Sequence, residues 1–176
     1  MSHSDKIELF KEETIKFNRK HNLISRKNTE KIIDEAIEEA KALTKHLKQH
    51  TNILDIGTGS GLPGIPLAIF NENKSVYLSE KNNKKNYHLK KTIKLLEIEN
   101  ATTIGSANKN TKINKKVDCV VTKAFASTKK TIDIANSFLE KPFTLMLLKG
   151  KLKTIYKEIA EANISCLLYT SPSPRD

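Results

Sequence analysis

ILDIGTGSGLPG, at residues 53–64, is an apolar run followed by closely spaced glycines. The apolar residues predict a buried strand, and Pro63 predicts the first turn of a helix, where proline is tolerated. Glycines between a strand and a helix permit a tight turn and let the backbone approach a ligand that a Cβ would exclude. In an open α/β sheet such a ligand lies beyond the carboxyl ends of the strands. The stretch therefore predicts a βα unit with a ligand site at its turn.

Short apolar runs alternate with helical periods over the rest of the chain. Strands are predicted at 52–56, 75–80, 101–105, 117–122 and 143–148, and helices at 63–71, 83–97, 128–140 and 152–163. This alternation predicts right-handed βαβ units. Continuous apolar runs such as 145–148 favour strands buried on both faces. The predicted fold class is therefore α/β, with a doubly wound, mostly parallel, Rossmann-like sheet.

Two amphipathic helices are predicted ahead of this unit, over 5–20 and 29–47, with Asn28 or Thr29 capping the second. We expect an N-terminal helical extension over 1–50 and the main domain over 51–165. The last residues, 166–176, read CLLYTSPSPRD and differ sharply in composition from the lysine-rich chain before them. We expect that string to be the translation of a sequencing adapter, and the native chain to continue past Ser165.

The chain carries a formal net charge of +11 over 176 residues. Such a surplus favours a polyanionic partner such as nucleic acid, because binding releases counterions from the phosphates. Heavy lysine use in an AT-rich genome would give the same composition. No run approaches the ~18 apolar residues of a membrane span, and the N-terminus has no apolar signal region, so we expect a cytoplasmic protein. Cys119 and Cys166 lack metal-ligand spacing, so no metal site is predicted.

The glycine stretch is compatible with two kinds of ligand. Gly59-x-Gly61-x-x-Gly64 satisfies the dinucleotide fingerprint. Asp55, placed near the strand end just ahead of the glycines, fits a methyl-donor site better, because it can orient the loop and accept a hydrogen bond from a ligand ammonium. Glu80, at the end of the next predicted strand, can bind the two ribose hydroxyls of a nucleoside. Glu80 supports a nucleoside ligand without choosing between S-adenosylmethionine and NAD.

Some kinds of methyl transfer are disfavoured by what the chain lacks. Proline occurs only at positions 63, 66, 142, 172 and 174, so there is no Asp/Asn/Ser-Pro-Pro-aromatic motif for exocyclic amines of adenine. Cys119, predicted to lie mid-strand without an adjacent proline, is a poor nucleophile for a pyrimidine ring. A guanine N7 has a free lone pair, so its methylation needs positioning and electrostatics rather than a strong base. Elimination therefore favours guanine N7.

The run DIGTGSGLPGIPLAI, residues 55–69, resembles the signature of the bacterial small-subunit rRNA guanine-N7 methyltransferases, the glucose-inhibited division protein B family. Further matches follow in order: Asn18-x-x-x-Asn22-Leu23-x-Ser25, Lys123-Ala124-Phe125-Ala126-Ser127 and Leu148-Lys149-Gly150. Together these motifs span residues 10–150. The resemblance implies a class I S-adenosylmethionine-dependent methyltransferase that acts on 16S rRNA or the small ribosomal subunit. We expect it to act as a monomer.

Site residues follow from the loop and from this resemblance. Those expected to hold the donor are Asp55, Gly57, Gly59, Gly61, Leu62, Glu80, Asn108, Lys109 and Lys123. Lys123 is also the candidate catalytic residue, at a position where the family has an arginine; lysine keeps the charge without the bidentate fork. Candidate contacts to RNA are Arg19, Lys20, Asn22, Arg26 and Lys149. Four histidines and two pairs of lysines are predicted to face solvent: His21, His46, His50, His88, Lys84, Lys85, Lys90 and Lys91.

The chain also departs from the family pattern. The family's His-x-x-Asp-Ser element is absent from residues 32–47, and Lys109 stands near the place of a glutamate. Two other functions stay open on these grounds: a non-catalytic RNA-binding remnant and an NAD-dependent oxidoreductase. The second would need a hydride-transfer constellation after the fifth strand, and none is visible.

Overall fold

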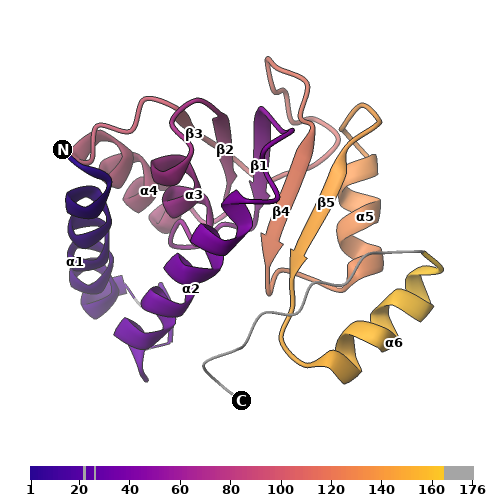
Figure 1. Cartoon of the computed structure of the whole chain (residues 1–176), viewed down its shortest axis with the longest axis horizontal. Helices are drawn as coiled ribbons and strands as arrows, with labels where there is room; N and C mark the ends of the chain where they lie inside the picture. The colour runs from indigo at the N-terminus through magenta and orange to yellow at the C-terminus, as the bar shows by residue number, and fades with distance from the viewer. Residues whose placement is uncertain (22, 26, 165–176) are drawn as a thin grey trace.

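The central feature of the computed structural model, which describes residues 1–21, 23–25 and 27–164, is a five-stranded sheet (Figure 1). Its strands lie in the order β3-β2-β1-β4-β5, and every neighbouring pair is parallel. The strand bounds are β1 Asn52–Ile56, β2 Ser75–Ser79, β3 Ala101–Ile104, β4 Cys119–Lys123 and β5 Thr144–Leu148. The chain thus winds outward from β1 in both directions, which confirms the predicted doubly wound sheet.

Six helices accompany the sheet in the described part of the chain: α1 His3–His21, α2 Thr29–Thr44, α3 Gly64–Phe70, α4 Asn83–Leu95, α5 Thr128–Asn136 and α6 Leu152–Ala162. All were predicted, although α2 and α5 end a few residues early. Asn28 occupies the N-cap position of α2 as expected, but it makes no side-chain cap hydrogen bond. Its φ of 60° is left-handed, whereas a capping side chain needs an extended backbone at that position.

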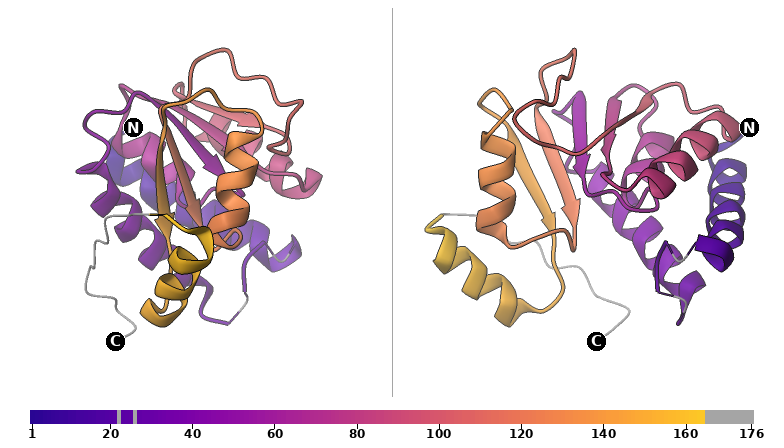
Figure 2. Two further views of the ribbon diagram at one scale, coloured as in Figure 1. Left: turned by 90° about the vertical axis from the view of Figure 1, so that its right-hand side faces the viewer. Right: turned by 180° about the vertical axis from the view of Figure 1, so that it is seen from behind.

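Alternate strand residues face two different layers. Ile53, Val76, Leu78 and Val121 point into a core shared with α1 to α4, while residues such as Leu54 point into a smaller core that includes side chains near α5. The N-terminal helices therefore pack into the same core as the glycine stretch. Figure 2 shows α5 on the side of the sheet opposite to α1 and α2, with α6 beyond it at the end of the molecule.

The carboxyl ends of the parallel strands meet at one edge of the sheet. That edge carries the glycine stretch after β1, Glu80 after β2, Lys123 at the end of β4 and Lys149 after β5. The topological switch lies between β1 and β4, because the chain runs outward on opposite sides of this pair. Ligands of open α/β sheets bind at such a switch. The segment 166–176, predicted to be non-native, lies outside the described residues.

Candidate functional site

The loop between β1 and α3 depends on its glycines. Gly57, Gly59 and Gly61 have φ values of 75°, 62° and 95°, a region that glycine adopts without the strain that a Cβ brings. The N–H groups of Gly57 and Thr58 both donate to the carbonyl of Ser79, at 2.9 and 3.1 Å. Leu62 packs into the main core beneath the loop. These hydrogen bonds fasten the loop to β2. The space beside Gly59 is open, because a Cβ added there would have only the carbonyl oxygen of Gly57 within 4 Å, at 3.9 Å.

Asp55 orients this loop from below. Its side chain is wholly buried, and its Oδ2 accepts a hydrogen bond from the N–H of Gly64 at 2.9 Å. Burial raises the pKa of the Asp55 carboxyl to about 7, and the nearby charge of Glu80 also acts to raise it. A Cβ on Gly64 would lie 2.7 Å from Oδ2, so glycine is required there. The predicted contact between Asp55 and a ligand ammonium stays a prediction.

Glu80 links the glycine loop to the start of α4. Its Oε2 accepts from the N–H of Gly59 at 3.1 Å and its Oε1 from the N–H of Asn82 at 2.7 Å. Asn82 in turn caps α4, because its Oδ1 accepts from Lys84 and Lys85 N–H groups. Only 8% of Glu80 is exposed. Its carboxylate lies beside the loop, and each of its oxygens already accepts one hydrogen bond. A second acceptor site on each oxygen is what a ribose diol would use.

Phe125 closes the other side of the loop. It follows Ala124, which has a φ of 49°, and its ring lies where a Cβ on Gly57 would stand. Phe125 is 38% exposed. The β4–α5 connection therefore brings a partly exposed aromatic ring against the first glycine of the loop, although the sequence motif was the only sign of it.

Lys123 and Lys149 are both paired with carboxylates from helices. The Nζ of Lys123 forms an ion pair with Glu39 of α2. The Nζ of Lys149 donates to the carbonyl of Ala126 at 2.6 Å and lies 2.8 Å from Glu158 of α6. Glu158 also accepts from the Thr128 N–H and hydroxyl, and these contacts keep the pKa of its carboxyl below the usual range. Lys149 therefore joins β5, α5 and α6, a structural contact in addition to its predicted contact with RNA.

The other predicted site residues lie in two places. Asn108 and Lys109 are exposed in the connection after β3, where Asn108 Oδ1 accepts from the N–H of Asn110 at 2.9 Å and so shapes the turn. Arg19 and Lys20 are exposed in the last turn of α1. Two predicted RNA contacts, Asn22 and Arg26, lie outside the described residues. The structure thus brings the loop, Glu80 and Phe125 together and leaves α1 as a separate group.

Asn18 has a structural role that its motif did not reveal. It is 2% exposed, its Oδ1 accepts from the N–H of Ile24 at 3.0 Å, and its Nδ2 donates to Thr29 Oγ1 at 3.2 Å. Asn18 therefore fastens the α1–α2 connection. A groove of about 1020 Å³ opens beside it between α1 and α2. The lining of this groove does not include the glycine loop.

One prediction of exposure was wrong. His88 is 1% exposed, and its ring lies 4.6 Å from that of Phe17, centroid to centroid. Burial lowers the pKa of His88 to about 4, so the ring is neutral. Cys119 opens β4 rather than lying in its middle, and burial raises the pKa of its thiol to about 12. A thiol that stays protonated is a poor nucleophile, as expected.

Residues 3–171 match the family model described as rRNA small subunit methyltransferase G, GidB. The chain belongs to this family. A relative from Brachyspira hyodysenteriae, named ribosomal RNA small subunit methyltransferase G, is 33% identical over 150 residues, which are 85% of this chain and 72% of the relative. One of the same name from Actinobacillus pleuropneumoniae is 36% identical over 118 residues, 67% of this chain. The chain spans 57% of that relative's length.

Solved structures share the architecture of this chain. The crystal structure of M. jannaschii TYW2 in complex with AdoMet aligns with a TM-score of 0.51 at 29% identity, covering 60% of this chain and 48% of that one. A ribosomal protein L11 methylase from Lactobacillus delbrueckii subsp. bulgaricus aligns with a TM-score of 0.59 at 16% identity, covering 79% and 74%. The second likeness shows the fold alone.

Clusters of metal-binding side chains and long apolar helices are both absent from the described ranges. No group of three or more histidine, cysteine, aspartate or glutamate side chains there could hold a metal ion. No helix in the same ranges has the length and apolar character needed to cross a membrane.

Proposed function

We propose that the full-length protein methylates a guanine N7 of small-subunit 16S rRNA, with S-adenosylmethionine as the methyl donor. The observation that carries the proposal is the glycine loop at the end of β1, fastened by Asp55 and Glu80 in a chain of the rRNA small subunit methyltransferase G family. The AdoMet complex of TYW2, similar in fold and 29% identical, supports the choice of donor. With ribosomal RNA as the substrate, we place this activity in the cytoplasm.

The residues of the loop fit such a donor. Asp55 Oδ1 and Ser60 Oγ are buried without a hydrogen-bond partner among the described residues, and Gly59 leaves open space above the loop. Glu80 stands where a carboxylate can accept from a ribose diol. A ligand ammonium beside Asp55 would lower the pKa of that carboxyl and favour its charged form. The chemistry supplied by the bound donor is a methyl group on a positively charged sulfur.

The chain has to orient the guanine rather than deprotonate it. N7 carries a lone pair, so the transfer needs alignment and a matched electrostatic environment. Phe125 offers a partly exposed ring beside Gly57, and Lys123 offers an ammonium at the same sheet edge. In the described structure Glu39 holds that ammonium. We infer that the guanine or its phosphate takes the place of Glu39 and gains a charge-assisted hydrogen bond.

A methyl-transfer assay tests the proposal. Full-length protein is incubated with methyl-labelled S-adenosylmethionine and unmethylated small-subunit RNA, and the modified atom is found by chemical cleavage at N7-methylguanine. We expect label at one guanine N7, and turnover about tenfold lower or worse for Lys123→Met, because the charge-assisted hydrogen bond is lost. Glu39→Gln should keep turnover, because it frees the lysine. RNA that is bound but never labelled would favour the non-catalytic remnant.

A further inference from the structure

The helix α4 presents an unusually basic surface. Its 13 residues include five lysines and no acidic residue. Tyr87 lies among them and is 64% exposed. Lys84, Lys90 and Lys91 are its neighbours at i−3, i+3 and i+4, so they share its side of the helix, and all three are exposed. The aromatic side chain of Tyr87 is thus exposed to solvent with positive charges around it.

Tyr87 is in contact with an aromatic ring of α1. The Phe17 ring of α1 lies 6.5 Å from that of Tyr87, centroid to centroid, and 4.3 Å from that of His21. Lys20, three positions after Phe17, extends the positive charge onto α1. The acid facing this cluster is Glu13, which lies 2.9 Å from Lys91 and 3.4 Å from Lys16. Its negative charge is therefore offset by two lysines.

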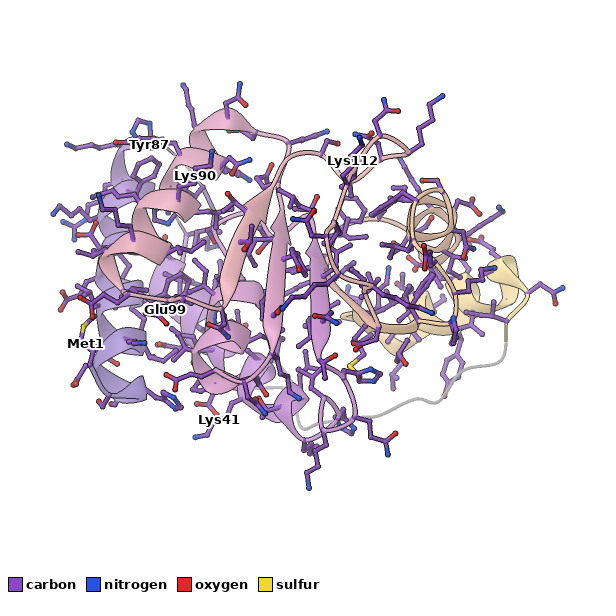
Figure 3. The ribbon with its side chains drawn as sticks, turned by 90° about the horizontal axis from the view of Figure 1, so that it is seen from above. Met1, Lys41, Tyr87, Lys90, Glu99 and Lys112 are labelled. Atoms are coloured by element: carbon purple, nitrogen blue, oxygen red, sulfur yellow. The ribbon has the colours of Figure 1, made fainter. Side chains whose placement is uncertain are left out.

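This surface begins beside the proposed donor site. Asn82 caps α4 and donates its N–H to Glu80, the carboxylate that fastens the glycine loop. Figure 3 shows Tyr87 and Lys90 together on α4, on the side of the molecule away from Lys41. A strand of nucleic acid with one base at the loop could therefore continue onto α4 without crossing the sheet.

We propose that Lys20, Lys84, Tyr87, Lys90 and Lys91, here called the α4 face, bind an unpaired segment of RNA next to the target guanine. This inference rests on the proposed function for its partner, but it concerns a surface outside the donor site. Lysines would contact phosphates, and Tyr87 would stack on an unpaired base, the arrangement by which proteins hold single-stranded nucleic acid. A paired helix hides its base faces, so a loop suits Tyr87 better than a duplex.

Binding of a fluorescent, unmethylated RNA stem-loop to the full chain tests the α4 face, with a duplex of the same stem for comparison. Tyr87→Ala should raise the Kd of the loop by about 5- to 100-fold, because the base no longer has a ring to stack on. Tyr87→Phe should bind like the parent protein. Replacing Lys84 and Lys90 by alanine should lower the slope of log affinity against log salt by about 0.7 for each phosphate that the variant no longer neutralises. Lys41→Ala, on the other side of the molecule, is the matched control and should change neither quantity.

The outcomes separate this inference from the proposed function. If the parent protein methylates RNA and Tyr87→Ala binds the loop equally well with the same salt slope, RNA binding by the α4 face is refuted and the proposed activity is retained. If the parent binds the loop through Tyr87 but transfers no methyl group, the proposed activity is refuted and RNA binding by the α4 face is retained. Binding to anionic phosphatidylglycerol vesicles with no binding to the loop would overturn the α4 face. S-adenosylmethionine affinity should be the same in every variant.

Discussion

The ring of Phe125 occupies the space that a Cβ on Gly57 would need. Two segments far apart in sequence, the glycine loop after β1 and the connection after β4, are therefore packed against each other across the topological switch. Gly57 meets two requirements at once, because its φ of 75° is also one that L side chains rarely adopt.

Gly57→Val should abolish binding of S-adenosylmethionine. The added methyl groups would overlap Phe125 and strain the loop, so the turn that frames the donor site would shift. Isothermal titration of the full-length variant measures the effect directly. Gly105→Ala is the matched control, because a Cβ there meets nothing within 4 Å; it should bind as the parent does.

Phe125→Ala in the Gly57→Val background separates the two requirements. It removes the steric overlap but leaves the backbone strain, so binding should recover only in part. Unchanged affinity in the single Gly57→Val variant would show that the donor does not depend on this loop.

Asp55→Asn should remove a pH-dependent loss of stability. Burial raises the pKa of the folded-state carboxyl to about 7 from 3.8. Between these values the unfolded chain releases a proton that the folded protein keeps, so the contribution of Asp55 to stability falls as pH rises and then levels off above about 7. Asparagine keeps an oxygen for the Gly64 N–H. Urea unfolding at several pH values should show that the free energy of unfolding of the variant, relative to that of the parent, increases from pH 4 to 7.

His88 acts in the opposite direction, which is why the comparison uses the difference between variant and parent. Its pKa is lowered from 6.5 to about 4 by burial, so the unfolded chain takes up a proton first as pH falls. Stability from His88 is therefore lost between about pH 6.5 and 4. This contribution is common to both proteins and cancels in the difference. A difference that does not vary with pH would contradict the ionisation assigned to Asp55.

Lys149→Met and Glu158→Gln should lower the free energy of unfolding by similar amounts, about 1–3 kcal/mol, because each removes a charge-assisted hydrogen bond between largely buried partners. The side chains are only 13% and 16% exposed. Denaturant unfolding measures both. A loss of RNA affinity in Lys149→Met alone, with no loss of stability, would show that the lysine serves RNA rather than the α5–α6 contact.

The strands and helices were predictable because their signals are local. Apolar runs mark the largely buried strands β1, β2 and β4, and the glycines of residues 57–61 mark the turn whatever its surroundings. The run 145–148 is a strand as predicted, but it is only partly buried rather than buried on both faces, because β5 is the last strand of the described sheet. His88 was mispredicted because flanking lysines suggested a solvent-facing stretch, whereas helical geometry turns His88, Leu89 and Thr92 inward. One buried histidine among lysines leaves little trace in periodicity.

The residues of the site were predictable where a motif carried them, and their contacts were not. Neither the Glu80–Gly59 hydrogen bond nor the Lys123–Glu39 ion pair could be read from the sequence. Each joins positions on different elements, and only the strand order brings those elements together. The contact of Phe125 with Gly57 likewise requires β4 to lie beside β1.

Calorimetric titration of the full-length protein with S-adenosylmethionine, and separately with NAD, tests most directly whether the glycine loop is a methyl-donor site. We expect one molecule of S-adenosylmethionine per chain, weaker binding in Glu80→Gln, and no heat of binding with NAD. Saturable binding of NAD, or no binding of S-adenosylmethionine by a folded protein, would contradict the assignment.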